Sequence, residues 1–336
     1  MMRAGTKPRI GFLGVGWIGR HRMEAMLATG LVEAAAFVEP NGDMAAAALA
    51  VAPGAQRLGS YDDLLGLDLD GIVIATPSAL HADQSIRALE AGKAVFCQKP
   101  LGRSAKEARA VVDAARRADR LLTVDLSYRF TAAMDAITPL VRSGELGHIH
   151  AVDLTFHNAY GPDKPWFYDR TLSGGGCLMD LGVHLVDLAL WALDFPEVER
   201  VDAALQSGGQ PMRDGDARVE DYAVATLHLD GGTIVRLACS WRLQAGQEAQ
   251  IEASFYGTQG AVAMRNVAGS FYDFEADRYH GTSRTRLVSP PDEWGGRAAA
   301  DWARRLAAGE RFGVDADHLV STAAALDAIY AGARKA

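Results

Sequence analysis

One lysine of this sequence stands where a sheet protein would bind a ligand. Lys99 follows the apolar run Ala94–Cys97 and precedes Pro100, so an ammonium group lies at the end of a predicted buried strand. Open α/β sheets bind ligands at the carboxyl ends of their parallel strands. A positive group in such a place can hydrogen-bond a substrate oxygen and stabilise negative charge that develops on it.

A second set of ionisable residues interrupts a segment that is otherwise apolar. The run Leu178–Leu193 predicts a buried helix, yet Asp180, His184 and Asp187 recur in it at i, i+4 and i+7. At about 100° per residue these positions fall within roughly 60° of one another. Because a buried carboxylate or imidazole needs hydrogen bonds, the stripe faces either a cleft or satisfied partners in the core.

Metal binding is another interpretation of this helix, since Cys177 lies near the same face and His157 could add a ligand. The sequence contains no HExxH motif and no paired CxxC motif, which are typical of zinc sites. We therefore predict that no metal is bound.

The segment RIGFLGVGWIGRH predicts a phosphate-binding loop. Gly14, Gly16 and Gly19 form G-x-G-x-x-G directly after the predicted strand Arg9–Leu13 and at the start of a helix. The first glycine permits a tight turn, the second lets the backbone approach a pyrophosphate, and the third allows close packing. The positive end of the helix dipole favours the phosphate. A glycine-rich turn that binds nothing is the alternative, which this context disfavours.

Two further strand ends bear on the cofactor. Glu39 ends the second predicted strand, where a carboxylate hydrogen-bonds an adenosine ribose and repels the 2′-phosphate of NADP. No Lys or Arg follows it at once, so the sequence favours NAD over NADP. Thr76 and Pro77 follow the fourth strand, and His81 falls in the first turn of the next helix. His81 either contacts the cofactor or only begins that helix.

These residues need elements that hold them, and the first half of the chain alternates short apolar runs with helix-length segments. Near-continuous apolar strands separated by helices predict a doubly wound parallel sheet, the Rossmann architecture. The six predicted strands are Arg9–Leu13, Glu33–Val38, Gln56–Leu58, Gly71–Ala75, Ala94–Cys97 and Leu121–Val124.

From about Phe130 the rhythm changes to longer β-rich runs, with Asp230-Gly231-Gly232 as a hairpin turn. This half predicts an α+β domain with a large, mainly antiparallel open sheet. We place an NAD-binding domain at residues 1–127 and a substrate-binding and oligomerisation domain at residues 128–336. The last predicted helix, Leu319–Ala333, is in a position to pack back on the first domain.

Composition narrows the classes of partner. The 336 residues are 49% hydrophobic and 23% charged, with a net charge of −8 and no dense basic run, which disfavours nucleic acid and anionic membranes. The three cysteines, Cys97, Cys177 and Cys239, are widely spaced and predict no disulfide framework. No apolar signal core follows the N-terminal basic residues, so we expect a cytoplasmic protein.

Together the motifs resemble the Gfo/Idh/MocA family of oxidoreductases, named after glucose–fructose oxidoreductase, inositol dehydrogenase and rhizopine catabolism. The family's lysine motif is typically Glu-Lys-Pro, whereas Gln98 precedes Lys99 here, which changes the local charge. The residues that carry the resemblance, in order along the chain, are Gly14, Gly16, Gly19, Thr76, Pro77, His81, Lys99, Pro100, Arg129, Phe130, Gly174, Gly175, Gly176, Asp180 and His184.

The resemblance implies hydride transfer between NAD(P) and a secondary hydroxyl or carbonyl of a sugar, cyclitol or related polyol. It implies that Lys99, Asp180 and His184 line the cleft beside the nicotinamide. Either His184, positioned by Asp180, takes the hydroxyl proton while Lys99 stabilises the oxygen, or Lys99 is itself the base.

The resemblance also implies a homodimer or homotetramer. We expect the cofactor to contact Gly14, Gly16, Trp17, Ile18, Glu39, Thr76, Pro77, His81, Gln98 and Lys99. We expect the substrate to contact Asn158, Trp166 and Arg170, in a polar and aromatic loop. Two other functions stay open: an NAD-dependent glycosidase that works by oxidation and elimination, and a non-catalytic nucleotide-binding sensor or corepressor.

Overall fold

The computed structural model describes residues 7–213 and 216–333. Contacts divide the chain into two compact units. The first unit contains the residues up to Ser127 together with Gly296–Val320. The second contains Tyr128–Gly295 together with the residues from Ser321 onward. The chain therefore crosses between the units more than once, which its sequence does not reveal.

The first unit is built on the predicted parallel sheet. Its strands lie in the order β3-β2-β1-β4-β5-β6, the doubly wound order of dinucleotide-binding folds. Every neighbouring pair is parallel. The strands are β1 (Arg9–Leu13), β2 (Glu33–Val38), β3 (Gln56–Leu58), β4 (Gly71–Ile74), β5 (Ala94–Cys97) and β6 (Leu122–Val124).

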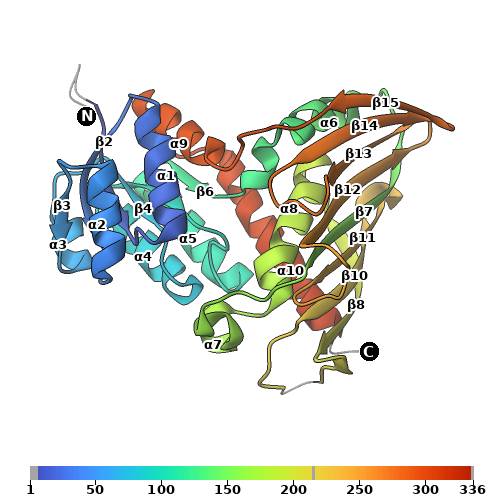
Figure 1. Ribbon diagram of the computed structural model, residues 1–336, viewed down its shortest axis with the longest axis horizontal. Helices are drawn as coiled ribbons and strands as arrows, with labels where there is room; N and C mark the ends of the chain where they lie inside the picture. Colours follow the sequence, from blue (N-terminus) through green and yellow to red (C-terminus); the bar gives the residue numbers. More distant parts are fainter. Residues whose placement is uncertain (1–6, 214–215, 334–336) are drawn as a thin grey trace. The chain divides into compact units, whose positions relative to one another are not determined.

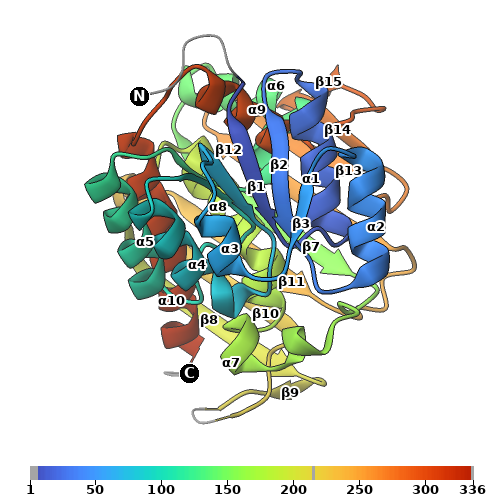
Figure 2. The same cartoon turned by 90° about the vertical axis from the view of Figure 1, so that its left-hand side faces the viewer.

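Helices flank this sheet, as Figure 2 shows. One of them, α9, is not predicted from the sequence and returns to the first unit from the far end of the chain. Its Trp302 is fully buried and its ring lies 5.9 Å from that of Phe96 on β5. The helices are α1 (Trp17–Ala28), α2 (Gly42–Val51), α3 (Tyr61–Leu65), α4 (Ser78–Glu90), α5 (Ala105–Ala118), α9 (Arg297–Ala307) and a 3-10 turn at Val314–Asp317.

The second unit contains the large open sheet, mostly antiparallel as predicted. Its order is β15-β14-β13-β12-β7-β11-β10-β8-β9. Only β7 and β11 pair in parallel among the neighbours that the structure describes. The strands are β7 (Ile149–Asn158), β8 (Val198–Ser207), β9 (Gln210–Pro211), β10 (Tyr222–Leu229), β11 (Ile234–Ser240), β12 (Ala249–Gly257), β13 (Ala261–Asn266), β14 (Phe274–His280) and β15 (Ser283–Val288).

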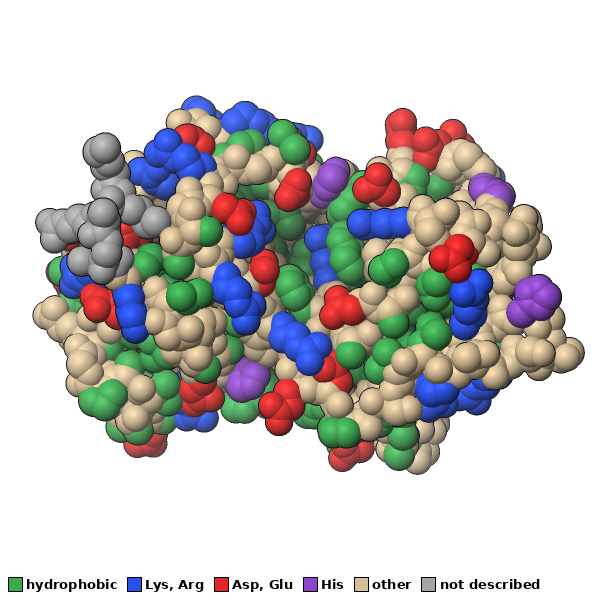
Figure 3. All heavy atoms as spheres, turned by 90° about the horizontal axis from the view of Figure 1, so that it is seen from above, with side chains coloured by type: hydrophobic (Ala, Val, Ile, Leu, Met, Phe, Trp, Pro, Cys, Tyr) green, Lys and Arg blue, Asp and Glu red, His purple; other side chains and the backbone are tan. Residues whose placement is uncertain are grey.

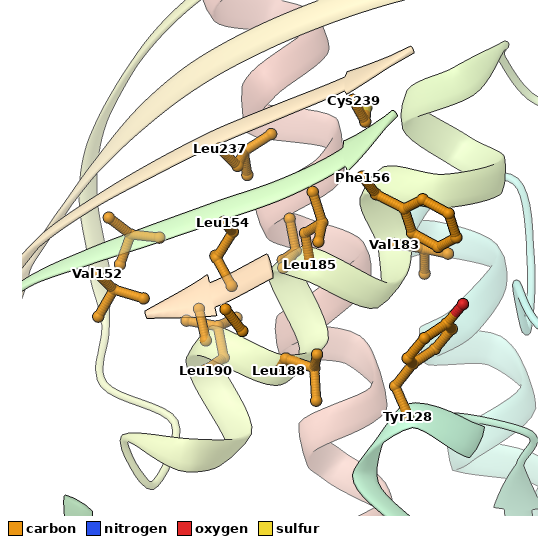
Figure 4. Close-up of a cluster of buried hydrophobic side chains, with 14 of the residues drawn as sticks. Tyr128, Val152, Leu154, Phe156, Val183, Leu185, Leu188, Leu190, Leu237 and Cys239 are labelled. Atoms are coloured by element: carbon orange, nitrogen blue, oxygen red, sulfur yellow. The ribbon is translucent and has the colours of Figure 1, made fainter. Parts of the chain in front are cut away.

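Helices of the second unit cover one face of that sheet, and Figure 1 shows the other face without them. Side chains of α8 pack into a core with β7 and β11, and Tyr128 lies at one end of it (Figure 4). The helices are α6 (Ala132–Arg142), α7 (Arg170–Ser173), a π-helical turn (Leu178–Gly182), α8 (Val183–Ala192), α10 (His318–Ala333) and 3-10 turns at Ser127–Phe130, Pro165–Tyr168 and Asp230–Gly232.

One sequence expectation for this unit needs adjustment. The run Leu178–Leu193 is not one α-helix, because it begins with a π-helical turn before α8 continues it. The last helix, α10, belongs to the second unit from Ser321 onward, and its predicted packing on the first domain stays a prediction.

One helical stretch, Arg170–Ala192, is long and apolar enough to cross a membrane by length and composition alone. Within the described residues, 83% of its most apolar window is buried inside the protein, as expected of a core helix. On the face seen in Figure 3, Lys and Arg side chains are interspersed with Asp and Glu side chains.

Candidate functional site

The glycine loop after β1 leaves room for a ligand. Gly14 has a φ of +84°, and a Cβ there would lie 2.6 Å from the carbonyl oxygen of Ala75, so only glycine fits. A Cβ on Gly19 would lie 2.2 Å from the carbonyl oxygen of Gly14. A Cβ on Gly16, in contrast, would meet no atom within 4 Å. The middle glycine thus borders open space, as a backbone that approaches a pyrophosphate requires.

The helix that follows this loop offers its backbone donors without a competitor. Gly16 caps α1 with no side-chain hydrogen bond, and the first turn contains no acidic residue. The first N–H groups of a helix have no partner within it, and the helix dipole makes this end positive. Trp17 is 60% exposed and its ring stacks on that of His21, while Ile18 is half-buried. The residues present therefore fit a pyrophosphate.

Glu39, at the end of β2, is tied to the glycine loop. Its Oε2 accepts a hydrogen bond from the backbone N–H of Val15 at 3.0 Å, and its Oε1 accepts one from Asn41 at 2.9 Å. Each carboxylate oxygen has a second lone pair, so both can still accept from ribose hydroxyls. Sequence reasoning missed Arg57, whose guanidinium donates to the carbonyl oxygen of Glu39 at 2.9 Å. Arg57 lies on β3, separated from Glu39 by the helix α2, so no local sequence motif predicts the contact.

His81 does not offer a ring nitrogen to a cofactor. Its Nδ1 lies 2.7 Å from the carbonyl oxygen of Pro100 and its Nε2 lies 2.7 Å from that of Thr76. The side chain is 1% exposed, and burial lowers the pKa of its imidazole. The ring of His81 thus links two loops, and its contact with the cofactor stays a prediction. Thr76 bonds Gln84 through its hydroxyl, and Thr76 and Pro77 are half-buried.

Gln98, which precedes Lys99, makes a contact that accounts for its neutral side chain. Its amide nitrogen donates to the carboxylate of Asp125, just beyond β6. Both side chains are buried, at 8% and 1% exposure. A glutamate at position 98 would place two carboxylates side by side, where like charges oppose each other. The sequence alone could not pair residues 98 and 125, because parallel strands bring them together.

In the second unit, the ionisable residues of the apolar helix separate into different environments. Oδ2 of Asp180 accepts a hydrogen bond from the indole N–H of Trp241 at 3.1 Å. The ring of His184 lies 4.8 Å from that of Tyr128. Burial, and next the negative charge of Asp180, raise the pKa of Tyr128 well above its ordinary value. Asp180, His184, Trp241 and Tyr128 therefore form one local group.

Asp187 belongs to a structural ion pair. It is 1% exposed and its carboxylate accepts two hydrogen bonds from the guanidinium of Arg129, with Thr322 as a further donor at 3.4 Å. The core interpretation of the polar stripe is therefore right for Asp187.

A buried carboxylate that sequence reasoning missed holds the glycine run before the π-helical turn. Oε1 of Glu220 accepts from the N–H groups of Gly176 at 2.8 Å and Leu178 at 3.0 Å, and from the Tyr330 hydroxyl at 2.8 Å. Burial raises the pKa of Glu220. A Cβ on Gly176 would lie 1.9 Å from the Glu220 carbonyl oxygen. This packing fixes the entry to the segment that carries Asp180.

The three residues expected to contact the substrate precede Asp180 in the sequence. Each of them contacts another residue of this chain. Asn158 accepts from the backbone N–H of Tyr160 at 2.7 Å. Trp166 stacks on Phe167 with ring centroids 3.8 Å apart. The guanidinium of Arg170 lies 5.8 Å from the ring centroid of Tyr330.

The geometry of the described residues contains no group of three or more His, Cys, Asp or Glu side chains arranged to hold a metal ion. His157 uses its Nδ1 for a 2.8 Å contact with the Ser240 hydroxyl. Cys177 lies with its sulfur 3.9 Å from that of Cys239.

Comparison with protein-family models gives two matches. Residues 8–126 match the model described as the oxidoreductase family, NAD-binding Rossmann fold. Residues 134–263 match the GFO/IDH/MocA C-terminal domain. The two models together span well over half of the chain.

Curated relatives with named activities match at moderate identity. The D-glucoside 3-dehydrogenase of Escherichia coli is 29% identical, and the match covers 60% of this chain and 60% of that protein. The 1,5-anhydro-D-fructose reductase of Ensifer adhaerens is 29% identical over 72% of this chain and 68% of that protein. The inositol 2-dehydrogenase of Rhizobium meliloti is 29% identical over 77% of this chain and 76% of that protein.

Solved structures match over nearly the whole chain and show the fold. Levoglucosan dehydrogenase with NADH has a TM-score of 0.84 at 22% identity and covers 98% of both chains. GenD2 from gentamicin A biosynthesis, in complex with NAD, has a TM-score of 0.80 at 24% identity, covering 99% of this chain and 97% of its own. KijD10, a 3-ketoreductase from Actinomadura kijaniata with NADP and TDP-benzene, has a TM-score of 0.83 at 23% identity and covers 98% of both chains.

Proposed function

Since this chain belongs to the GFO/IDH/MocA oxidoreductase family, with that family's NAD-binding Rossmann fold, we propose that it is an NAD-dependent dehydrogenase or reductase. Its reaction is hydride transfer between the nicotinamide and a secondary hydroxyl or carbonyl of a sugar, cyclitol or related polyol. The observation that carries this proposal is the glycine loop, in which Gly16 borders open space beside the uncapped start of α1.

The choice of NAD over NADP rests on Glu39. Its carboxylate keeps free lone pairs for ribose hydroxyls and repels a 2′-phosphate. Solved relatives hold either cofactor, since levoglucosan dehydrogenase is bound to NADH and KijD10 to NADP. Arg57 lies beside Glu39 and could pair with a 2′-phosphate if the carboxylate were absent.

Replacing Glu39 by alanine is expected to weaken NAD binding about tenfold, the cost of one lost hydrogen bond to a charged group. NADP binding is expected to weaken less or to improve, because repulsion disappears and Arg57 remains. Titration calorimetry of both cofactors checks this. The matched control is Glu24→Ala, an exposed acid of α1 that pairs with Arg20. An unchanged ratio of the two affinities would remove Glu39 from the site.

We assign the proton chemistry to Lys99, Asp180 and His184. When bound, the cofactor supplies the hydride acceptor. In oxidation, the imidazole of His184 takes the hydroxyl proton, and the buried setting beside Tyr128 keeps water from competing. Asp180 orients the imidazole. Lys99 donates a hydrogen bond to the same substrate oxygen and stabilises its developing negative charge. The alternative assignment is that Lys99 takes the hydroxyl proton and His184 hydrogen-bonds the substrate oxygen.

A sugar or cyclitol is the proposed substrate class. Several relatives are named for such substrates, among them D-glucoside 3-dehydrogenase and inositol 2-dehydrogenase. Aromatic faces and hydrogen-bonding groups suit a polyol ring. We propose that Asn158, Trp166 and Arg170 contact it, together with Trp241, whose indole already bonds Asp180.

We propose that the protein forms a homodimer or homotetramer through the open face of its large sheet. That face holds a groove of about 620 Å³. Along one row of it, Val224 lies in register with Ala204 on β8 and Ala238 on β11, so this part of the row is small and apolar, before the row continues to Thr155 on β7. A neighbouring row pairs Arg236 with Asp153. A face of this kind fits a second copy of itself.

We also propose a cytoplasmic location. The three cysteines are free and buried, which supports a reducing compartment.

Replacing Val224 by arginine is expected to shift the protein to a monomer, because a charge would be buried in that apolar row. Sedimentation equilibrium of the variant and the wild-type protein checks the mass. Leu80→Arg, at a 45%-exposed leucine of α4, is the matched control. A wild-type monomer, or a Val224→Arg variant with the wild-type mass, would contradict the proposed interface.

The proposed function is tested by NADH formation with a panel of sugars, sugar acids and inositols, with NAD and NADP in parallel. Reduction of NAD by a ring polyol supports the proposal. Release of a leaving sugar without net NADH would indicate the glycosidase instead. Confirmed NAD binding with no turnover of any alcohol or ketone would indicate a sensor.

A further inference from the structure

A buried charge network surrounds the residue that precedes Lys99. The carboxylate of Asp125 accepts hydrogen bonds from the Gln98 amide, from Nε of Arg22 and, at 2.7 Å, from the Ser127 hydroxyl. Arg22 also donates to Ser127 at 3.2 Å. All four side chains are under 9% exposed. One carboxylate and one guanidinium thus balance each other inside the first unit.

This network joins two parts of the proposed site. Arg22 belongs to α1, the helix that begins at the glycine loop. Gln98 directly follows β5, and its backbone N–H donates to Ile74 of β4 at 2.9 Å. The network therefore connects the cofactor helix to the strand end that presents Lys99.

Lys99 is consequently held from both sides. Gln98, before it, is fixed by its side chain on Asp125. The carbonyl oxygen of Pro100, after it, contacts the buried ring of His81 at 2.7 Å. A lysine side chain has four rotatable bonds, so its reach is defined only if its backbone is fixed. The two anchors supply that fixed point.

We propose that Arg22, Asp125 and Gln98 are positioning residues for Lys99, and that the charge of Asp125 requires a neutral partner at position 98. This inference rests on the proposed function, because it takes Lys99 to act on the reacting oxygen. This charge balance predicts that positions 98 and 125 can exchange their amide and carboxylate without loss of function. Two carboxylates or two amides at these positions are expected to disturb the position of Lys99.

The test is a swap. Gln98→Glu places two carboxylates together, Asp125→Asn leaves Arg22 without its counter-charge, and the double variant restores one carboxylate and one amide. Each single variant is expected to lower kcat about tenfold or more, and the double variant to recover to within about threefold of wild type. Any change in the Kd for NAD should be smaller than the change in kcat, since the glycine loop is untouched. Gln56→Glu, at an exposed glutamine of β3, controls for added charge.

Wild-type kcat in Gln98→Glu, or a double variant as slow as the two single losses multiplied, would overturn the proposal. Melting temperatures of the four proteins separate this failure from failure of the proposed function. If the wild-type protein binds NAD but turns over nothing, the proposed function fails. The network is then judged by whether both single variants melt lower and the swap restores the wild-type melting temperature.

Discussion

Replacing Lys99 by methionine is expected to lower kcat by about 10²-fold or more while NAD binding stays within a few-fold of wild type. Methionine keeps the length and apolar stem of lysine and removes its charge and its donors. Loss of an interaction made with the reacting oxygen in the transition state lowers kcat and kcat/KM together. Steady-state kinetics and calorimetric titration with NAD measure the two quantities.

Lys106→Met is the matched control, because Lys106 is an exposed residue of α5 in the same unit. It should retain wild-type kcat. Normal turnover by Lys99→Met would remove Lys99 from the chemistry, and loss of NAD binding would reassign it to the cofactor alone.

Replacing His184 by glutamine is expected to lower kcat by roughly 10²- to 10⁴-fold, the range for loss of a general base. The side chain is 8% exposed and packs against Tyr128 and Phe156. Glutamine roughly fills that space and retains hydrogen-bonding atoms, but it cannot take up a proton. The kcat of the variant, with its melting temperature to confirm folding, makes the measurement.

The pH dependence of kcat/KM shows whether His184 or Lys99 is the proton acceptor. A base must be deprotonated to act, so the wild-type kcat/KM rises with pH along an acidic limb. Whichever of His184→Gln and Lys99→Met loses that limb has lost the proton acceptor. His148→Gln, at an exposed histidine before β7, serves as the control. Wild-type turnover in His184→Gln would show that the imidazole takes no part.

The first unit was predictable because its signals are local. The apolar runs and the glycine motif lie within a few residues of the elements they specify, and the strand order follows from the doubly wound architecture. What the sequence could not give was α9, which returns from residue 297 to bury Trp302 against the sheet. Contacts between distant segments leave no periodic signal.

The candidate site divides in the same way. Lys99, Asp180 and His184 stand out because charge interrupts apolar runs. The residues that hold the candidate site in place do not stand out in the sequence. Asp125, Glu220 and Arg57 are ordinary polar residues whose roles depend on tertiary contacts. His81 stands out in the sequence, but the two carbonyl oxygens that its ring nitrogens face belong to loops that the sequence cannot place. The π-helical turn before α8 also lies beyond a rule that assumes α-helical spacing.

The central claim, hydride transfer from a polyol carbon to NAD, is tested most directly with a substrate deuterated at the reacting carbon. The best alcohol from the panel would be deuterated at that position, and the NADH formed would be analysed by mass spectrometry. We predict that the reduced cofactor gains one deuterium, and that Lys99→Met forms the same product more slowly. Substrate conversion without deuterium in the cofactor, or with no net cofactor reduction, would contradict the account.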